Sequence, residues 1–424
     1  MRTSYYVGIT GMGIVSSIGD DIPSFCNSLK DGVSGIKRTT NIKSPKLSVN
    51  IAAEIQDFSF LEALNRYQDI PDKIIHDAKR LGQRAPFSVQ TSIISAIEAW
   101  SDAKLLNHNC SSERIGIIVG GQNSTQNYQY SLIPKFEKNP EYLSPRYALE
   151  FLETNQVGVL SELFSIRGEG FMVGGASATG NVALVKGHQL VSSGLVDICL
   201  IVGTVADLSP MDIQGFINIG AMGGKKFADQ PERACRPFDK EHEGFIYGQS
   251  SACVILESEA SAHKRGVSFL AAIGGSSLIL DANSSADPSV DGEKRAMALA
   301  LEQSGLSIFE VDYLNTHGSS SPLGDKTEAK AISELFGSHA SKLWVNATKG
   351  LVGHCLYSAG IVEVIATVLQ MKENFIHPNI NLEEAISSKL KFCGSKSINQ
   401  TVNVAMSNSF GFGGINSSIV LKKS

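Results

Sequence analysis

The stretch NATKGLVGHCLYSAGIVE, residues 346–363, decides how the rest of this sequence is interpreted. It places Lys349 and His354 in a glycine-rich loop that runs into a predicted helix carrying Glu363. Glycine lets a backbone turn sharply and lets a substrate approach it closely. The carboxylate of Glu363 can return from the helix to the lysine as a charge partner. The stretch therefore predicts a polar site at the start of a helix.

Two further glycine-rich stretches carry residues typical of a site. NTHGSSSPLGDKTE, residues 315–328, places His317 directly after a predicted strand, in a loop of glycine, serine and proline. A single histidine is usually structural, but loops at strand ends often carry binding and catalytic groups. NSFGFGGINSS, residues 408–418, is a turn whose backbone N–H groups can face a site and whose Phe410 and Phe412 can gate it. The three stretches together indicate one site.

A fourth stretch, GGASATGNVAL at residues 174–184, places Ser177 in a tight turn before a run with helical spacing. A nucleophile there would have helix N-terminal N–H groups beside it to stabilise an oxyanion. A serine that caps the helix is the alternative explanation. The serine lies between Gly175 and Gly180, a spacing one residue longer than the GxSxG nucleophile elbow of hydrolases. The hydrolase elbow is therefore not matched, and the other two explanations stay open at this point.

Composition restricts the class of protein. The chain has 424 residues, of which 42% are hydrophobic and 19% charged, with 40 glycines, which is typical of an α/β enzyme of two domains or one duplicated unit. The net charge of −5 argues against a general nucleic-acid binder. The sequence contains no CxxC or HExxH pattern, so it indicates no metal site. TGMGIVSS, residues 10–17, has a serine at the third glycine position of the dinucleotide fingerprint, so we expect no nucleotide cofactor.

The expected location follows from the cysteines and the apolar runs. Seven dispersed cysteines are typical of a reduced cytosolic protein. The first residues, MRTSYYVGITG, lack the charged-then-apolar plan of a signal peptide. The longest apolar runs, such as residues 198–202, are far too short to cross a membrane. We therefore expect a cytoplasmic protein with no membrane segment.

Strand-like and helical runs alternate along the chain, which predicts α/β layers with strands buried between helices. The pattern restarts after residue 266, so we expect two related halves, residues 1–262 and 263–424. The first strand is expected to end at Gly11 and Gly13. Strands are predicted over 5–10, 114–119, 197–202, 252–256, 269–273, 311–314, 402–406 and 418–421, and helices over 22–30, 88–100, 292–304, 326–335 and 361–371.

The four stretches together resemble the β-ketoacyl synthases of fatty-acid and polyketide synthesis, a branch of the thiolase superfamily. The resemblance covers essentially the whole chain, from VGITGMGIVSSIG (7–19) through CRPFDKEHEGFIYGQSSACVILE (235–257) to the GFGG turn. It implies a thiolase-like five-layer α-β-α-β-α fold built from two similar halves. Proteins of this family are usually homodimers, so a homodimer is expected here.

The resemblance also implies roles for the site residues. His317 and His354 match the two family histidines that stabilise the negative charge formed when a malonyl thioester loses carbon dioxide. Lys349 and Glu363 match residues that fix the charge and orientation of these histidines. Further matches are Ser319 and Ser321, where the family has hydroxyl residues that bind the pantetheine arm, and Phe412, a gating aromatic whose N–H would form an oxyanion hole with that of Ser177. Phe410, which precedes the GFGG turn, is expected to bind the substrate as well. For Phe412 the alternative is ordinary core packing.

The sequence departs from the family pattern at Ser177, where these synthases carry a cysteine. Cys355 does not substitute for it, because it follows His354 at a position where the family has an apolar residue. A serine hydroxyl is a much weaker nucleophile than a thiolate and needs a general base. The resemblance therefore implies that loading of an acyl chain is lost while decarboxylation is retained.

The expected function is decarboxylation of malonyl-acyl carrier protein to acetyl-acyl carrier protein in bacterial polyketide biosynthesis, as in β-branching cassettes. The partner would be an acyl carrier protein that holds the substrate on its phosphopantetheine arm, and a hydroxymethylglutaryl-synthase-type enzyme would consume the acetyl group. No bound cofactor is expected. One alternative is a ketosynthase or acyltransferase that uses Ser177 as nucleophile. The other is a non-catalytic partner subunit resembling a chain-length factor, although such subunits usually lose the histidines.

Overall fold

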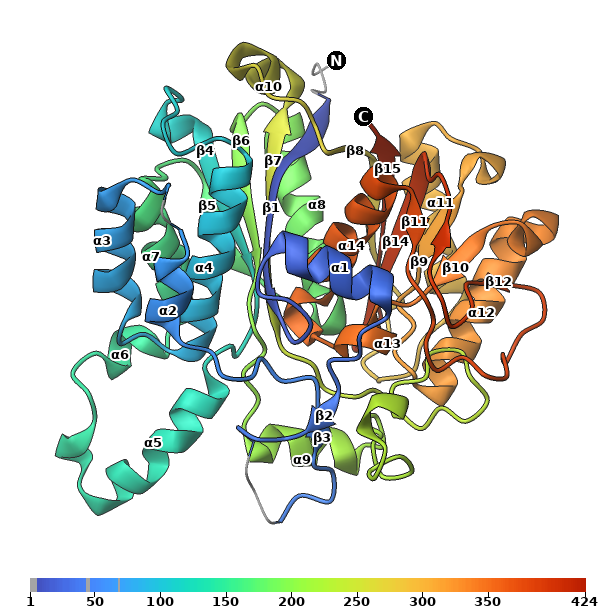
Figure 1. The fold of residues 1–424 in the computed structure, drawn as a ribbon, viewed down its shortest axis with the longest axis horizontal. Coiled ribbons are helices and arrows are strands. Elements are labelled where there is room, and N and C mark those ends of the chain that lie inside the picture. Colours follow the sequence, from blue (N-terminus) through green and yellow to red (C-terminus); the bar gives the residue numbers. More distant parts are fainter. Residues whose placement is uncertain (1–5, 43–45, 68) are drawn as a thin grey trace.

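The protein is arranged in five layers, in which two β layers enclose a central helical layer and further helices cover the outer faces (Figure 1). A computed structural model describes residues 6–42, 46–67 and 69–424. The central layer consists of α8 (Thr179–Ser192) and α14 (Ala359–Glu373), which contact each other and strands of both β layers. The predicted five-layer α-β-α-β-α arrangement is confirmed.

The two β layers repeat one pattern of strand directions. The strands run in the order β12-β10-β9-β14-β15-β8-β1-β7-β6-β4-β5, and β1 meets β8 where Gly8 pairs with Ala272 and Ile9 with Ala271. Outward from that junction, each layer has two antiparallel pairings followed by parallel ones. The strands are β1 (Val7–Ser16), β4 (Ile115–Gly120), β5 (Gly170–Val173), β6 (Ile198–Gly203), β7 (Ser250–Ser258), β8 (Ala271–Leu280), β9 (Tyr313–Asn315), β10 (Trp344–Asn346), β12 (Lys391–Phe392), β14 (Val404–Gly411) and β15 (Ile415–Lys423).

Amphipathic helices cover the outer faces of both layers. One set packs on the layer of β1 and β7, the other on the layer of β8 and β15, and a helical arm projects from the first (Figure 1). The predicted helices are confirmed within a few residues at each end. The first set includes α4 (Phe87–Asp102) and α7 (Thr154–Phe164), and the second set includes α11 (Val290–Ser304) and α12 (Pro322–Phe336). The arm consists of α5 (Gln126–Lys138) and α6 (Tyr147–Glu150). Helix α1 (Ile22–Asp31) lies beside α14.

The predicted end of the first strand is wrong. β1 continues through Gly11 and Gly13 to Ser16. The glycines are required by close packing, because a Cβ atom on Gly11 would lie 2.3 Å from the carbonyl oxygen of Ala99 on α4. Glycine therefore marks the approach of a helix to the strand here, and not a turn. The predicted start of this strand at Tyr5 lies outside the described residues.

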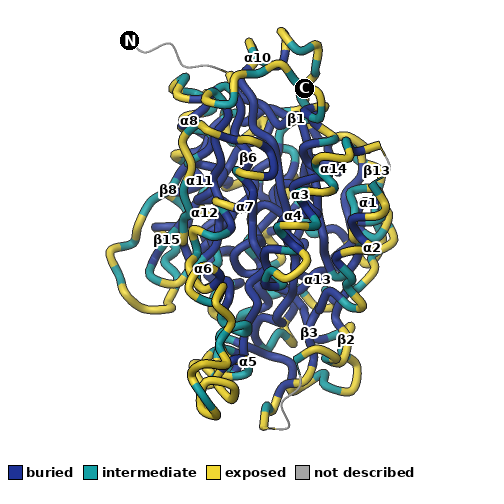
Figure 2. Tube along the Cα trace, turned by 90° about the vertical axis from the view of Figure 1, so that its left-hand side faces the viewer, coloured by how far each residue is buried: buried dark blue, intermediate teal, exposed yellow. Residues whose placement is uncertain are grey.

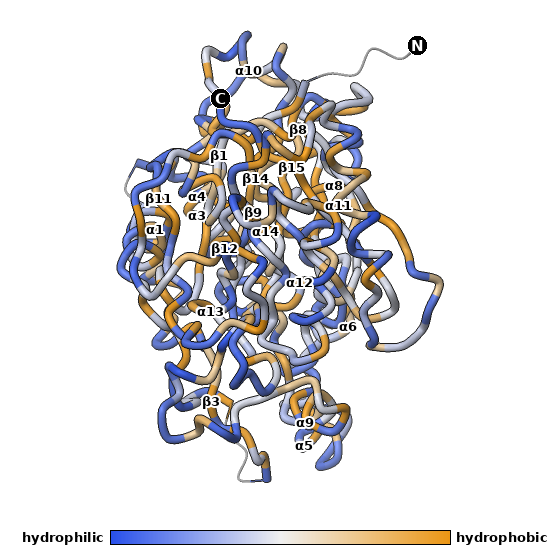
Figure 3. Tube along the Cα trace, turned by 90° about the vertical axis from the view of Figure 1, so that its right-hand side faces the viewer, coloured by the Kyte–Doolittle hydropathy of each residue, from blue (hydrophilic) through white to orange (hydrophobic). Residues whose placement is uncertain are grey.

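Burial follows the layers. The central strands and both central helices are buried along most of their length (Figure 2), and α14 is among the most apolar helices of the chain (Figure 3). Burial of apolar surface contributes about 25 cal/mol per Å² to folding, so these layers carry most of the stabilisation. Within the described ranges, no helix combines the length and the apolar character that a membrane span requires.

Candidate active site

Two similar turns meet where the central helices begin. A short 3₁₀ turn, Ala176–Ala178, leads into α8, and another, Leu356–Ser358, leads into α14. Ala176 and Leu356, the first residues of these turns, have φ values of 48° and 49°, in the left-handed region that non-glycine residues rarely adopt. The turns therefore share one strained backbone geometry and carry Ser177 and the residues after His354.

Two glycines bring these helices together. A Cβ atom on Gly180 would lie 2.8 Å from the backbone nitrogen of Ile361, and one on Gly360 would lie 2.5 Å from the Oδ1 atom of Asn181. A larger residue at either position would push the helices apart. The pair of glycines thus sets how close the serine turn lies to the histidine turn.

Ser177 and His354 are hydrogen-bonded. The Oγ atom of Ser177 lies 2.9 Å from the Nε2 atom of His354. The opposite ring nitrogen, Nδ1, accepts a hydrogen bond of 3.1 Å from the backbone N–H of Leu356. A neutral imidazole carries one proton, so a ring nitrogen that accepts an N–H leaves the proton on the other one. His354 therefore presents an Nε2–H donor to the serine and to the cavity.

Both histidines are held neutral. Burial, and then the nearby charge of Lys349, lowers the pKa of His354 well below its ordinary value. The pKa of His317 is lowered in the same way, mainly by burial and further by Lys349 and His354. The two rings lie edge to face with centroids 5.5 Å apart. The site thus holds two neutral imidazoles side by side, which suits them to donate hydrogen bonds.

Lys349 and Glu363 form a buried ion pair behind the histidines. Each side chain is 1% exposed, and the Nζ atom of Lys349 contacts the Oε1 atom of Glu363. The same Nζ donates a hydrogen bond of 2.6 Å to the backbone carbonyl of His317. Burial raises the pKa of Glu363 to about 7, against the opposing effect of the lysine. The predicted contact between the helix carboxylate and the lysine is confirmed, and the pair connects α14 to the histidine loop.

A cavity of about 460 Å³ collects most of the predicted residues. Its volume lies within the range of small-molecule sites. Lys349 and Glu363 lie behind its wall. The predicted residues that line it are Ser177, His317, Ser319, Ser321, His354, Phe410 and Phe412.

Phe410, at the end of β14, and Phe412, in the GFGG turn that follows, differ in environment. Phe410 is buried and packs on the ring of His317, with centroids 5.8 Å apart. Phe412 is 37% exposed at the cavity, so the alternative of core packing is wrong for this residue. The turn lies close to the serine, because a Cβ atom on Gly411 would be 2.6 Å from the carbonyl oxygen of Gly175.

The alternative that Ser177 caps a helix is not supported. The residue at the N-cap of α8 is Ala178, which has no side-chain cap. Thr179 closes the turn instead: its Oγ1 atom accepts from the Gly175 N–H at 2.8 Å and donates to the Ala176 carbonyl at 2.7 Å. The hydroxyl of Ser177 is thus left facing His354 and the cavity.

Cys355 does not take the place of a nucleophile. Its side chain is buried beneath the loop, and burial raises the pKa of its thiol above the ordinary value. A thiol that stays protonated is a poor nucleophile. It is also absent from the residues that line the cavity.

Four acidic residues that line the cavity were not predicted: Asp281, Asp287, Glu293 and Glu328. Glu328 accepts hydrogen bonds from the backbone N–H groups of His317 and Gly318, at 2.9 and 2.8 Å, and so fixes the histidine loop. Glu293 lies on α11 at the spacing of its buried apolar residues, which is a signal that the sequence did contain.

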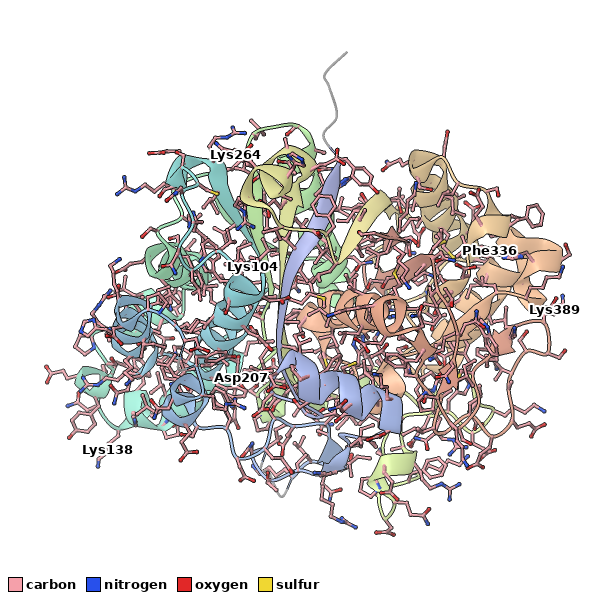
Figure 4. All side chains as sticks on the ribbon, turned by 45° about the horizontal axis from the view of Figure 1, so that its top comes forward. Lys104, Lys138, Asp207, Lys264, Phe336 and Lys389 are labelled. Carbon is pink, nitrogen blue, oxygen red and sulfur yellow. The ribbon has the colours of Figure 1, made fainter. Side chains whose placement is uncertain are left out.

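A second, larger cavity of about 700 Å³ holds none of the predicted residues. Two of its lysines, Lys104 and Lys264, are labelled in Figure 4. Arg114 and Arg265 at its wall are bonded to the carboxylates of Asp197 and Glu257. Among the described residues, no group of three or more histidine, cysteine or acidic side chains is arranged to hold a metal ion.

The layered fold and the paired histidines are those of a thiolase-like ketosynthase. The β-ketoacyl synthase N-terminal domain family matches residues 5–262, and the β-ketoacyl synthase C-terminal domain family matches residues 270–383. The chain belongs to the β-ketoacyl synthase family of enzymes.

Two curated relatives cover nearly the whole chain. The polyketide biosynthesis malonyl-ACP decarboxylase PksF of Bacillus subtilis is 37% identical over 416 residues, which are 98% of this chain and 96% of that protein. A 3-oxoacyl-(acyl-carrier-protein) synthase 2 of Coxiella burnetii is 31% identical over 428 residues, 98% of each chain.

Solved structures agree with the fold. The ishigamide ketosynthase/chain length factor superposes with a TM-score of 0.87 at 26% identity, over 99% of this chain and all of the other. A β-ketoacyl synthase from Burkholderia phymatum superposes with a TM-score of 0.84 at 25% identity, over the same shares.

Proposed function

We propose that the protein decarboxylates malonyl-acyl carrier protein to acetyl-acyl carrier protein. The observation that carries the proposal is the hydrogen bond from the N–H of Leu356 to the Nδ1 atom of His354, from which we assign the proton of the ring to Nε2. A histidine fixed in this form donates a hydrogen bond and cannot take the proton of Ser177. The identity of 37% to a protein named as a malonyl-ACP decarboxylase supports the same reaction.

The chemistry requires donors aimed at one oxygen. When the malonyl carboxylate leaves as carbon dioxide, its electron pair passes into the thioester and forms an enolate. Neutral His317 and His354 would both donate to the enolate oxygen, which lowers the barrier in a site with little water. The backbone N–H groups of Ser177 and Phe412 would form a separate oxyanion hole beside these donors. Lys349 and Glu363 would hold the loop of His317 in position.

The carrier protein would present the substrate through the exposed mouth of the cavity. Ser319 and Ser321 line it and supply hydroxyl groups for the amides of a pantetheine arm. Phe410 and Phe412 would form the apolar side of the channel, with Phe412 as its gate. A phosphopantetheine arm on the substrate makes a bound cofactor unnecessary.

The biological setting we propose is β-branching in a bacterial polyketide pathway, in the cytoplasm. A hydroxymethylglutaryl-synthase-type enzyme would then use the acetyl group. A homodimer is supported by two features of the chain: β5 lies at the end of the strand order, and apolar side chains on the neighbouring arm are exposed. A strand at the edge of a sheet and exposed apolar side chains would both be covered by a second copy of the chain.

The second candidate is a condensing or acyl-transfer enzyme with Ser177 as nucleophile. Its support is the 2.9 Å contact between Ser177 and His354, the spacing of a nucleophile and its base. The protonated Nε2 atom of His354 argues against it. A non-catalytic subunit is disfavoured because His317, His354, Lys349 and Glu363 are all assembled.

The test is incubation of the protein with malonyl-loaded carrier protein alone, followed by intact-protein mass spectrometry. We expect acetyl-carrier protein to accumulate without any acyl primer, metal or nucleotide. Malonyl-carrier protein that persists in the presence of folded enzyme would contradict the proposal. An acyl adduct on Ser177 that forms and turns over would support the second candidate.

A further inference from the structure

Glu293 is a carboxyl group in a position normally occupied by an apolar side chain. On α11 it shares one face with Ala296, Met297, Ala300 and Leu301, all of which are buried. Its own exposed fraction is 1%. Burying a carboxylate without a partner costs several kcal/mol, so a glutamate in such a place is neutral or is matched by a donor.

No such donor is present within the described part of the chain. The Oε2 atom of Glu293 is buried without a hydrogen-bond partner. The side chain lines the same cavity as Ser177, His317 and His354. The carboxyl group of Glu293 thus lies in the wall of the cavity in which the proposed reaction takes place, with one oxygen unpartnered.

The charged groups around Glu293 are also acidic. Glu328 and Asp325 lie on α12, which packs against α11, and Asp281 lies at the end of β8. A Cβ atom on Gly292 would be 1.7 Å from the Oδ1 atom of Asp281, so this carboxyl packs on the first turn of α11. The lysine and arginine that follow Glu293 on α11 pair elsewhere, with Glu334 and Asp291.

These surroundings favour the protonated form. Burial, and then the carboxylates of Glu328, Asp281 and Asp325, raises the pKa of Glu293 well above its ordinary value. The neutral histidines cannot supply a proton without becoming anions. Burial also raises the pKa of Glu328, to about 7, but both oxygens of that carboxyl accept backbone N–H groups of the histidine loop. Glu293 is therefore the protonated carboxyl at this cavity that is not tied to the loop, and its proton can be transferred.

A decarboxylase needs such a proton, whereas a condensing enzyme does not. In condensation the enolate carbon attacks an acyl group, but in formation of acetyl it must be protonated. We propose that Glu293 is the acid that delivers this proton to the enolate carbon, through a water molecule in the cavity. The inference rests on the proposed function and deepens it.

The step balances as follows. The bond between the methylene carbon and the carboxylate breaks, carbon dioxide leaves, and the electron pair forms the enolate. The enolate carbon takes a proton from the carboxyl of Glu293, which gives the acetyl methyl group and leaves Glu293 as carboxylate. Solvent then returns one proton to Glu293. One malonyl thioester and one proton thus yield one acetyl thioester and one carbon dioxide.

The experiment follows the methyl group made from malonyl-carrier protein in equal parts of H₂O and D₂O. Mass spectrometry gives both the rate and the ratio of CH₃ to CH₂D in the product. We expect Glu293→Gln to slow turnover about 10²-fold and to change the ratio, because bulk water then supplies the proton. Glu293→Asp should restore part of the rate. Glu302→Gln, an exposed carboxyl at the other end of α11, is the control and should behave as wild type.

The pH profile gives an independent readout. The wild-type rate should fall on the alkaline side as Glu293 ionises, and Glu293→Gln should lack that limb. A Glu293→Gln enzyme with the wild-type rate and isotope ratio would overturn the inference, as would a Glu293→Asp enzyme no better than a folded Glu293→Gln enzyme. If Glu293→Gln does not fold, the isotope ratio and alkaline limb of Glu293→Asp decide. A wild-type protein that leaves malonyl-carrier protein intact would contradict the proposed function itself. That result differs from those that overturn the role of Glu293, because they require an active wild-type enzyme.

Discussion

The Nε2 atom of His354 lies 2.9 Å from the Oγ atom of Ser177, and the proton in this bond belongs to the histidine. The pair therefore has the spacing of a nucleophile and its base, but the histidine donates the hydrogen bond and the serine accepts it. Ser177 accepts from His354, so the imidazole presents no free nitrogen that could take the proton of the hydroxyl. This relationship argues against His354 as a general base for Ser177.

Replacing Ser177 with alanine tests the role of its hydroxyl. If the hydroxyl contributes one hydrogen bond of about 1–1.5 kcal/mol, decarboxylation should fall about tenfold. Steady-state rates on malonyl-carrier protein measure the effect. Near-complete loss, together with an acyl adduct on Ser177 in the wild type, would contradict this expectation and favour the nucleophile.

Ser177→Cys should restore a reactive thiol, because the N–H groups at the start of α8 favour a thiolate. Labelling by iodoacetamide, mapped to the peptide that contains residue 177, measures this. The background should carry Cys110→Ser, because Cys110 is half-buried while the other native cysteines are buried. An unlabelled Ser177→Cys protein would mean that the turn does not activate a thiol.

Loss of either histidine removes a donor to the enolate. We expect His317→Ala and His354→Ala each to slow decarboxylation about 10²–10³-fold, with folding retained as judged by circular dichroism. His339→Ala is the matched control, since His339 bonds to the Val311 carbonyl and is not among the residues that line the cavity. Turnover near the wild-type rate in both cavity variants would remove the histidines from the mechanism.

The lowered pKa values of His317 and His354 predict a particular pH dependence. In the folded protein both rings stay neutral below the ordinary histidine pKa of about 6.5, so decarboxylation should show no acid limb at that pH. In the unfolded chain the same histidines take up protons as the pH falls through about 6.5, so their contribution to folding stability is present above that pH and declines below it. Rates and urea unfolding measured between pH 5 and about 8 test both points. An acid limb centred near about 6.5 would contradict the first.

Breaking the buried ion pair should destabilise the fold. Lys349→Met leaves Glu363 buried without its partner and should lower the free energy of unfolding by about 3–5 kcal/mol, measured by urea denaturation. The double variant Lys349→Met/Glu363→Leu should recover most of that stability, because no charge is left unpaired. It should stay impaired in decarboxylation, since the bond to the His317 carbonyl is also lost. A double variant as active as the wild type would show that the pair is only structural.

The exposed arm predicts a homodimer. Phe136 and Leu149 are 51% and 63% exposed on α5 and α6. We expect Phe136→Asp/Leu149→Asp to shift the protein from dimer to monomer in light scattering at micromolar concentration. Phe309→Asp is the control, because Phe309 is 67% exposed but lies outside the arm. A wild-type monomer, or an obligate complex with an active ketosynthase, would contradict the prediction.

The sequence predicted the α/β alternation, and most of the predicted site residues line the cavity, because each lies in a short, recognisable pattern. His317 and His354 lie in glycine-rich loops, and the spacing of the apolar residues predicted the strands and helices. The error at Gly11 has a physical cause: a glycine can mark a turn or the approach of a helix, and only the packing partner distinguishes them.

Other features depend on contacts that a local pattern does not contain. The proton position on His354 is set by the N–H of Leu356, in a turn whose backbone is held in the left-handed region by the helices around it. Glu293 was missed because an acidic residue in the first turn of a helix is usually solvated there. The helical period of the sequence places Glu293 on the buried face of its helix, but only the folded structure shows that it lies near Glu328.

The glycine contact between α8 and α14 also governs when the site can exist. Ser177 and His354 are separated by 177 residues, and the contact at Gly180 and Gly360 must form before they meet. At a synthesis rate of about 5–20 residues per second, the serine turn leaves the ribosome roughly 9–35 s before its histidine. During that interval the N-terminal layer can pair its own strands, but it presents Ser177 with no donor beside it. We therefore expect a nascent chain to be inert toward malonyl thioesters until the last central helix has docked.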